Sequence, residues 1–217
     1  MSRLRRVAAI LFFALVVRPV LMIATGLRVI GRERLPLSGP AVVAANHNSH
    51  LDVVALMSLF PLRLLHRVRP VAAADHFLKP GFVGWMARTL LNIIPIDRSG
   101  CGADAAIAPV CQALHANAIV IMFPEGTRGE PEVMARFRRG TSLLAKAFRD
   151  TPFVPVYLHG LGKSLPRGEW RFVPFAAEVH IGRSRSDATG TGRPMAEQLQ
   201  DDVVAIAARL PRAGFVD

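Results

Sequence analysis

A histidine and an aspartate five positions apart are the residues of this chain best suited to chemistry. His47 and Asp52 lie in the stretch ANHNSHLD (residues 45–52), directly after an apolar run. A carboxylate that accepts from one imidazole nitrogen fixes the tautomer of the ring, and the other nitrogen can then take a proton from a hydroxyl. The pair is therefore a candidate general base acting on an alcohol.

The same stretch has a second interpretation. Ser49 and Asp52 have the spacing of a capping box, in which Asp52 would only satisfy a free backbone N–H. On one continuous helix the five-residue spacing would separate His47 and Asp52 by about 140°. If the helix begins near Ser49, the two side chains can meet. His50 could join His47 as a metal ligand, but no further cluster completes a site, so we expect no metal.

A second polar turn, FPEGTR (residues 123–128), follows another apolar run 78 residues after His47. Gly126 allows close backbone approach. The guanidinium of Arg128 suits a phosphate, and Thr127 adds a hydroxyl. The alternative is an ordinary turn in which Arg128 pairs with Glu125.

Arg98 ends a third apolar stretch, IIPIDR (residues 93–98). A second guanidinium at another strand end suggests an anion pocket shared with the 123–128 turn. Pairing of Arg98 with its neighbour Asp97 is the alternative, and such an exposed pair would contribute little.

The hydroxyl on which the base acts belongs to the substrate. The chain has no Gly-x-Ser-x-Gly elbow and no cysteine near His47. Cys101 and Cys111 have neither CxxC spacing nor the pattern of a disulfide framework, which favours a reduced compartment. Direct transfer is therefore favoured over a covalent enzyme intermediate.

Composition indicates one domain that associates with a membrane. The chain has 217 residues, of which 51% are hydrophobic, and a mean hydropathy of +0.32. Its net charge of +11 favours anionic partners. A nucleic-acid binder would carry interleaved aromatics, yet there is only one Tyr. Acidic lipid headgroups fit better, and an acidic carrier protein would also suit the charge.

The N-terminal segment, residues 1–30, is expected to associate with the membrane, and residues 31–217 to form the main domain. Arg3, Arg5 and Arg6 precede an apolar run at residues 7–17, which Arg18 and Pro19 separate from a second run at 20–27. About 20 apolar residues are needed to span a bilayer. The pattern predicts an interfacial helix held by anionic headgroups. A kinked span and a signal peptide are the alternatives, although no convincing cleavage site follows.

The remainder predicts an α/β domain with a mostly parallel or mixed central sheet flanked by helices. The expected strands are residues 41–45, 68–73, 92–96, 118–123, 153–158 and 177–181. The expected helices are residues 51–60, 81–90, 104–116, 140–149 and 194–210.

Taken together, these motifs resemble the glycerolipid acyltransferases of the lysophosphatidic acid acyltransferase type. His47 and Asp52 resemble the family's His-x4-Asp block, and residues 92–98 its second block. Residues 123–128 resemble the third block, and residues 154–156 the fourth. The FRRG stretch at residues 137–140 is similar to the basic stretch that follows the third block.

The resemblance implies transfer of a fatty acyl group from acyl-CoA or acyl carrier protein to a lysophospholipid hydroxyl, with no cofactor beyond this co-substrate. In the family the first-block His is the base and its Asp orients it. The roles in glycerophosphate binding map to Arg98, Glu125, Gly126 and Arg128. Many members carry Gly early in the second block, where this chain has Asn92 and its neighbours, so acceptor recognition can differ. We expect the protein at the cell membrane, peripheral or monotopic on the cytoplasmic face. The rival interpretation is a non-catalytic peripheral membrane protein that binds anionic lipid.

Overall fold

The computed structural model describes residues 2–49, 51–74, 89–97, 102–127, 133–164, 176–189 and 192–210. Four sequence features fall outside these ranges: His50, Arg98, Cys101 and Arg128. Most of the helix expected at residues 81–90 lies outside them as well.

The described residues form one seven-stranded sheet in the order β1-β7-β6-β2-β5-β3-β4. Neighbours are parallel except β6 and β7, which are antiparallel. Because β1 runs parallel to β7, these two strands oppose the other five. The strands are β1 (Arg28–Ile30), β2 (Ala41–Ala45), β3 (Val68–Ala73), β4 (Ile94–Ile96), β5 (Ile119–Met122), β6 (Phe153–His159) and β7 (Glu178–Ile181). The mixed central sheet that the sequence predicts is confirmed.

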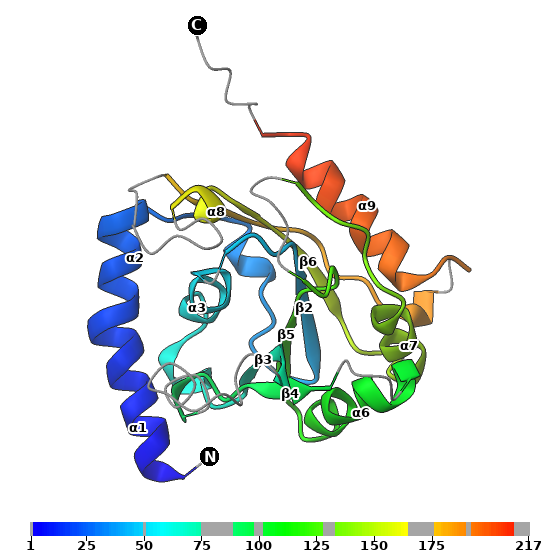
Figure 1. The fold of residues 1–217 in the computed structure, drawn as a ribbon, viewed down its shortest axis with the longest axis horizontal. Coiled ribbons are helices and arrows are strands. Elements are labelled where there is room, and N and C mark those ends of the chain that lie inside the picture. The colour runs from blue at the N-terminus through cyan, green and yellow to red at the C-terminus, as the bar shows by residue number, and fades with distance from the viewer. Residues whose placement is uncertain are drawn as a thin grey trace, which may run out of the picture.

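Helices cover both faces of this sheet (Figure 1). They are α1 (Arg3–Phe12), α2 (Arg18–Thr25), α3 (Leu51–Ser58), α6 (Gly102–His115), α7 (Gly140–Ala147), α8 (Leu161–Ser164) and α9 (Met195–Ala207). Short 3-10 turns occupy Arg32–Arg34, Leu62–Leu64 and Asp187–Thr189.

The central strand β2 shows why two helical layers are needed. All five of its residues are fully buried. Val43 and its alternate neighbours pack into a core with the N-terminal helix and α3, whereas Val42 and Ala44 pack into a second core with α6, α7 and α9. A strand buried on both faces reads as an unbroken apolar run, which is how this one could be located from the sequence.

The first helical layer contains a continuous N-terminal helix, which runs through the Arg18 and Pro19 that separate the two apolar runs of the sequence. A π-helical turn at Phe13–Val17 joins α1 to α2. Proline lacks an N–H and clashes with the preceding turn of a helix. A π turn, which is wider, can accommodate the missing hydrogen bond and the proline ring without ending the helix. Within the described residues, Arg3–Thr25 is long and apolar enough to cross a membrane, judged by length and composition.

One face of this N-terminal helix packs on the domain, and the other is exposed. Ala9, Phe13, Val17 and Leu21 recur every four residues and are buried. On the outer face, Ile23 is 82% exposed. The helix therefore has two apolar faces, of which the protein itself covers only one.

Arg18 fixes this helix to α3. Its Nε donates to the carbonyl of Ser58 at 3.2 Å, and its Nη2 donates to that of Phe60 at 2.7 Å. The last carbonyls of a helix have no partner within the helix, and cations are favourable there. The charge that seemed to interrupt the apolar segment thus points into the protein.

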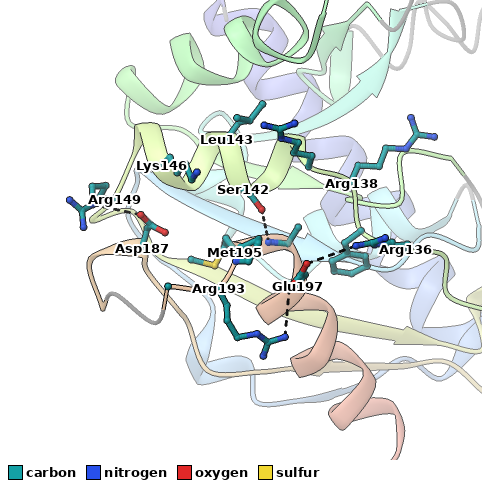
Figure 2. A pocket seen from close by; sticks show the side chains of 15 residues that line it. Arg136, Arg138, Ser142, Leu143, Lys146, Arg149, Asp187, Arg193, Met195 and Glu197 are labelled. Atoms are coloured by element: carbon teal, nitrogen blue, oxygen red, sulfur yellow. Dashed lines mark hydrogen bonds and ion pairs between the residues drawn. The ribbon is translucent and has the colours of Figure 1, made fainter.

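In the opposite layer, α7 and α9 are joined by a helix cap (Figure 2). The backbone N–H of Ala196, in the first turn of α9, donates to Oγ of Ser142 at 3.0 Å. Ser142 is buried in α7. A hydroxyl that satisfies a free N–H at a helix start stabilises that helix, so this bond fixes the start of α9 against α7.

Candidate active site

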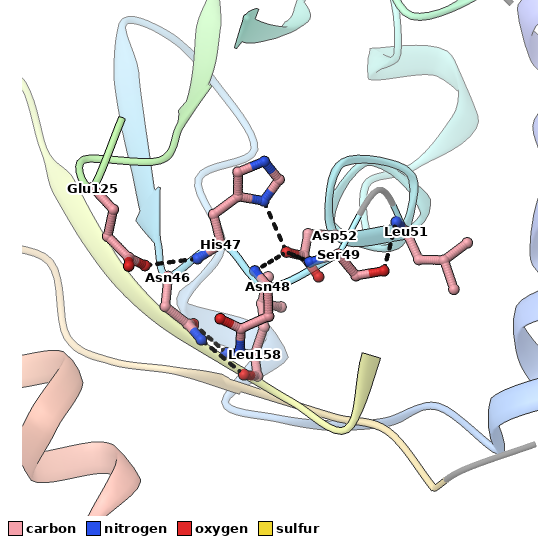
Figure 3. Close-up of polar contacts among 8 residues, drawn as sticks. All are labelled: Asn46, His47, Asn48, Ser49, Leu51, Asp52, Glu125 and Leu158. Carbon is pink, nitrogen blue, oxygen red and sulfur yellow. Dashed lines mark hydrogen bonds and ion pairs between the residues drawn. The ribbon is translucent and has the colours of Figure 1, made fainter. Parts of the chain in front are cut away.

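The two polar turns of the sequence meet at the carboxyl-terminal edge of the parallel strands. His47 follows β2 and Glu125 follows β5, and these strands are neighbours in the sheet. The backbone N–H of His47 donates to Oε1 of Glu125 at 2.8 Å (Figure 3). Ligands of open α/β sheets bind at this edge, which makes it the candidate active site.

His47 and Asp52 form the predicted pair. Nδ1 of His47 lies 2.9 Å from Oδ2 of Asp52. Asp52 is 0% exposed, while the His47 side chain retains 17% exposure. A carboxylate at Nδ1 places the ring proton on that nitrogen, so Nε2 carries the lone pair. The pair therefore has the geometry that the sequence predicts for a candidate base.

Asp52 is also the helix cap that the alternative interpretation predicts. Its Oδ2 accepts the backbone N–H groups of Asn48 at 2.7 Å and Ser49 at 2.8 Å. Oγ of Ser49 accepts the N–H of Leu51 at 3.2 Å. Oδ1 of Asp52 is buried and has no hydrogen-bond partner among the described residues. Capping and orientation of His47 are therefore performed by one oxygen of one side chain.

Phe123 determines the plane of the His47 ring. The two ring centroids are 4.0 Å apart, and the planes differ by 19°. Phe123 ends the run that forms β5 and is partly buried against the core. The imidazole is thus held by stacking on one face and by Asp52 at one edge, and few rotamers remain open to it.

Glu125 joins three segments of backbone. The residue is 2% exposed. Its Oε1 bonds to His47 and its Oε2 accepts the N–H of Ala135 at 2.7 Å. Burial raises the pKa of the Glu125 carboxyl, whereas the N–H groups of Ala135 and His47 oppose that rise. Both carboxylate oxygens therefore bond to backbone; the substrate-binding role that the resemblance implies stays a prediction.

Gly126 is required by the approach of Arg138. Its φ is +79°, and a Cβ there would lie 2.5 Å from Nε of Arg138. That nitrogen donates to the carbonyl of Glu125 at 2.9 Å. The backbone N–H of Arg138 also donates to the carbonyl of Pro124 at 2.9 Å. These two bonds hold the basic stretch at residues 137–140 against the turn at residues 123–128.

Asn46 is a site residue that the sequence reasoning missed. Its Nδ2 donates to the carbonyl of Leu158 at 2.9 Å, and its Oδ1 accepts the N–H of Leu158 at 2.7 Å. These two bonds extend the pairing of β2 with β6 by one step through a side chain. The available signal was a buried-strand pattern that ends in a polar residue immediately before His47.

The remaining predicted residues have different outcomes. Thr127 lies in the described turn and is exposed. Arg98 and Arg128 lie outside the described residues, so their contribution to a phosphate pocket stays a prediction. Within the described ranges, no group of three or more His, Cys, Asp or Glu side chains could hold a metal ion.

Fold and site together define an α/β protein with a hydrogen-bonded histidine–aspartate pair at the carboxyl edge of its sheet. The chain belongs to the acyltransferase family, which matches residues 26–159. The family resemblance seen in the motifs is thereby confirmed.

Individual relatives agree with this family. The chain is 33% identical over 153 residues to the human 1-acyl-sn-glycerol-3-phosphate acyltransferase alpha, covering 70% of this chain and 52% of the relative. It is 32% identical over 140 residues to a chloroplastic 1-acyl-sn-glycerol-3-phosphate acyltransferase of Brassica napus, covering 64% and 38%. The chain therefore spans about half or less of these relatives.

A solved structure shows the same fold. The 1-acyl-sn-glycerophosphate acyltransferase PlsC of Thermotoga maritima superposes with a TM-score of 0.72 at 21% identity. The superposition covers 95% of this chain and 81% of the other. At this identity the likeness establishes the architecture, including the mixed sheet.

Proposed function

We propose that this protein transfers a fatty acyl group from an acyl thioester to the free hydroxyl of a lysophospholipid. The thioester is acyl-CoA or the acylated form of acyl carrier protein. The favoured acceptor is 1-acyl-sn-glycerol-3-phosphate, which would give phosphatidic acid. The observation that carries the proposal is the bond of 2.9 Å between Nδ1 of His47 and the buried carboxylate of Asp52. The names of the relatives support the acceptor class.

In the proposed reaction, Nε2 of His47 removes the proton of the acceptor hydroxyl as its oxygen attacks the thioester carbonyl carbon. The tetrahedral intermediate collapses, the carbon–sulfur bond breaks, and the imidazolium returns the proton to the leaving thiolate. Asp52 stabilises the imidazolium between these steps. The enzyme is thus regenerated without a covalent intermediate.

Asp52 can serve this role because backbone N–H groups already bind its carboxylate. The N–H groups of Asn48 and Ser49 both donate to the oxygen that faces His47. Backbone N–H groups that donate to a carboxylate oxygen hold that oxygen in place. The site therefore stabilises a positive imidazolium with groups that need no rearrangement.

The acceptor phosphate would be held by Arg128 and Arg98, with Thr127 as a hydroxyl partner, as the motifs predict. A phosphate fixed at the strand edge would bring the free hydroxyl to His47 and convert a bimolecular encounter into an oriented one.

We also propose that the N-terminal helix keeps the domain at the cytoplasmic face of a membrane, as a peripheral or monotopic protein. Its inner face is covered by the domain, while Leu4, Leu15, Met22 and Ile23 are exposed. An apolar helix face with arginines at one end suits an interface of acyl chains and anionic headgroups.

One assay tests the proposed function. Purified protein is supplied with a mixture of lysolipids and with both acyl-CoA and acyl carrier protein, and the products are identified by mass spectrometry. Phosphatidic acid as the main product supports the proposal. Acylation of another lysolipid only would correct the acceptor, and binding of lipid without any acylated product would favour the non-catalytic alternative.

A further inference from the structure

A basic cleft lies between α7 and the start of α9, in the helical layer that does not contain the N-terminal helix. It has a volume of about 920 Å³. Six cationic side chains line it: Arg136, Arg138, Arg139, Lys146, Arg149 and Arg193. The two carboxylates that share the lining are Asp187 and Glu197. The cleft therefore has an excess of positive charge in a concave site of the size that small ligands occupy.

The cleft cations are divided between paired and available groups. Arg149 lies 3.6 Å from Asp187, and Arg136 lies 3.9 Å from Glu197. Arg193 is paired as well, at 2.9 Å from Asp201 and 3.9 Å from Glu197. Arg139 and Lys146 have no ion pair with any described residue. Figure 2 shows Lys146 and Arg149 on the α7 side and Arg193 on the α9 side. An anion that entered would meet cations from two walls.

The cleft is connected to the candidate active site through Arg138. This residue lines the cleft, and its Nε donates to the carbonyl of Glu125 at 2.9 Å. Glu125 in turn accepts the N–H of His47. A ligand bound in the cleft would therefore contact Arg138, which is linked to His47 through Glu125.

The position of the cleft argues against a lipid headgroup of the associated membrane. The exposed apolar face belongs to the helix of α1 and α2, whereas α7 and α9 lie at the opposite side of the sheet (Figure 1). The two helical layers also contribute to separate cores. A cleft on the far side from the apolar face favours a water-soluble polyanion, and its concave form favours a small molecule over a protein surface.

We infer that this cleft binds the adenosine 3′,5′-bisphosphate portion of coenzyme A, so that the acyl donor approaches from the side opposite the membrane helix. This inference rests on the proposed function and deepens it by assigning the donor and its place. Phosphates carry the charge that Arg139 and Lys146, which have no ion pair with any described residue, would neutralise, and guanidinium groups bind phosphates through paired hydrogen bonds.

The test measures binding of adenosine 3′,5′-bisphosphate to the full chain in detergent by isothermal titration calorimetry. The probed variant is Lys146→Glu/Arg149→Glu, and the matched control is Arg63→Glu/Arg209→Glu, which reverses two exposed arginines outside the cleft lining. We expect one site in the wild type, at least about tenfold weaker binding in the cleft variant, and less than about twofold change in the control. Unchanged melting temperatures establish that both variants fold.

Kinetics separate this inference from the proposed function. The cleft variant should raise the KM for acyl-CoA and leave the KM for the lysolipid unchanged. If the cleft binds the bisphosphate but the protein transfers no acyl group, the cleft assignment is supported and the proposed function is contradicted. Acyl transfer with wild-type bisphosphate binding in the cleft variant, or with no bisphosphate binding at all, would overturn the cleft assignment. Use of acyl carrier protein alone would overturn it in favour of a protein donor.

Discussion

The carboxylate of Glu125 is bonded to the backbone N–H of His47 at 2.8 Å, across the boundary between β5 and β2. The same carboxylate holds Ala135 through its second oxygen. The position of the candidate base in space therefore depends on a residue 78 positions away in the sequence. A role in positioning His47 makes predictions that differ from a role in binding the substrate.

Glu125→Gln should lower kcat by about 10- to 100-fold and change the KM of the acceptor by less than about threefold. Glutamine keeps one acceptor but turns an NH2 group toward an N–H, so one backbone bond is lost and the base is displaced. Steady-state kinetics with lysophosphatidate check this. A large increase in KM at normal kcat would instead support the substrate-binding role that the family resemblance implies.

The raised pKa of Glu125 should also appear in the stability of the protein. A carboxyl whose pKa is higher in the folded state binds protons more tightly there, so folding is favoured at low pH. The free energy of unfolding of the wild type, relative to Glu125→Gln, should fall as the pH rises from the ordinary glutamate pKa to the raised value, and then level off. Urea unfolding across this range measures it; a difference that rises with pH would contradict the burial effect.

Removing the base or its partner should abolish most of the activity. His47→Ala and Asp52→Asn should each lower acyl transfer by at least about 10²-fold, because the first removes the proton acceptor and the second weakens its orientation. Lipid binding should survive in both. His115→Ala, an exposed histidine on α6, is the matched control and should retain normal turnover. Near-normal turnover of His47→Ala would end the proposed mechanism.

Asn46→Ala should destabilise the protein by about 1–3 kcal/mol, because it leaves the buried N–H and carbonyl of Leu158 without partners. Chemical unfolding gives this difference directly. Asn46→Asp retains the acceptor but turns a buried carboxylate oxygen toward the carbonyl of Leu158, and should not restore wild-type stability. Wild-type stability of the alanine variant would mean that water satisfies Leu158.

Exposed residues of the N-terminal helix should determine membrane binding. Met22→Gln/Ile23→Gln should weaken binding to vesicles of anionic phospholipid by about tenfold or more, since each apolar side chain contributes on the order of 1.5–3 kcal/mol when buried. The melting temperature should be unchanged, as these side chains are 74% and 82% exposed.

Phe13→Ala is the contrasting variant on the inner face of the same helix. It removes a fully buried ring and should lower stability by about 3–5 kcal/mol. Equal vesicle binding by the wild type and the outer-face variant in flotation assays would refute a membrane role for that face.

Much of the fold follows from local pattern. β2 and β3 begin and end at the residues predicted. β2 is buried on both faces and is therefore an unbroken apolar run, whereas β3 contains Arg69 and Pro70 and is buried at only three of its six residues. β1 was not predicted, since two of its three residues are exposed and the segment is a strand only through its pairing with β7. The helix continues through Pro19 by way of a π turn, and the bonds of Arg18 to α3 hold it there, which local pattern did not reveal.

The sequence by itself determined the chemistry that is available at His47 and Asp52, because residue type and spacing at a strand end depend only on neighbours in the chain. Whether Asp52 caps the helix or orients the histidine was decided by the tertiary structure, in which one oxygen does both. The bonds of Glu125 to His47 and of Asn46 to Leu158 were likewise decided there. Such contacts arise from the order of strands in the sheet, which brings together residues that no local pattern connects.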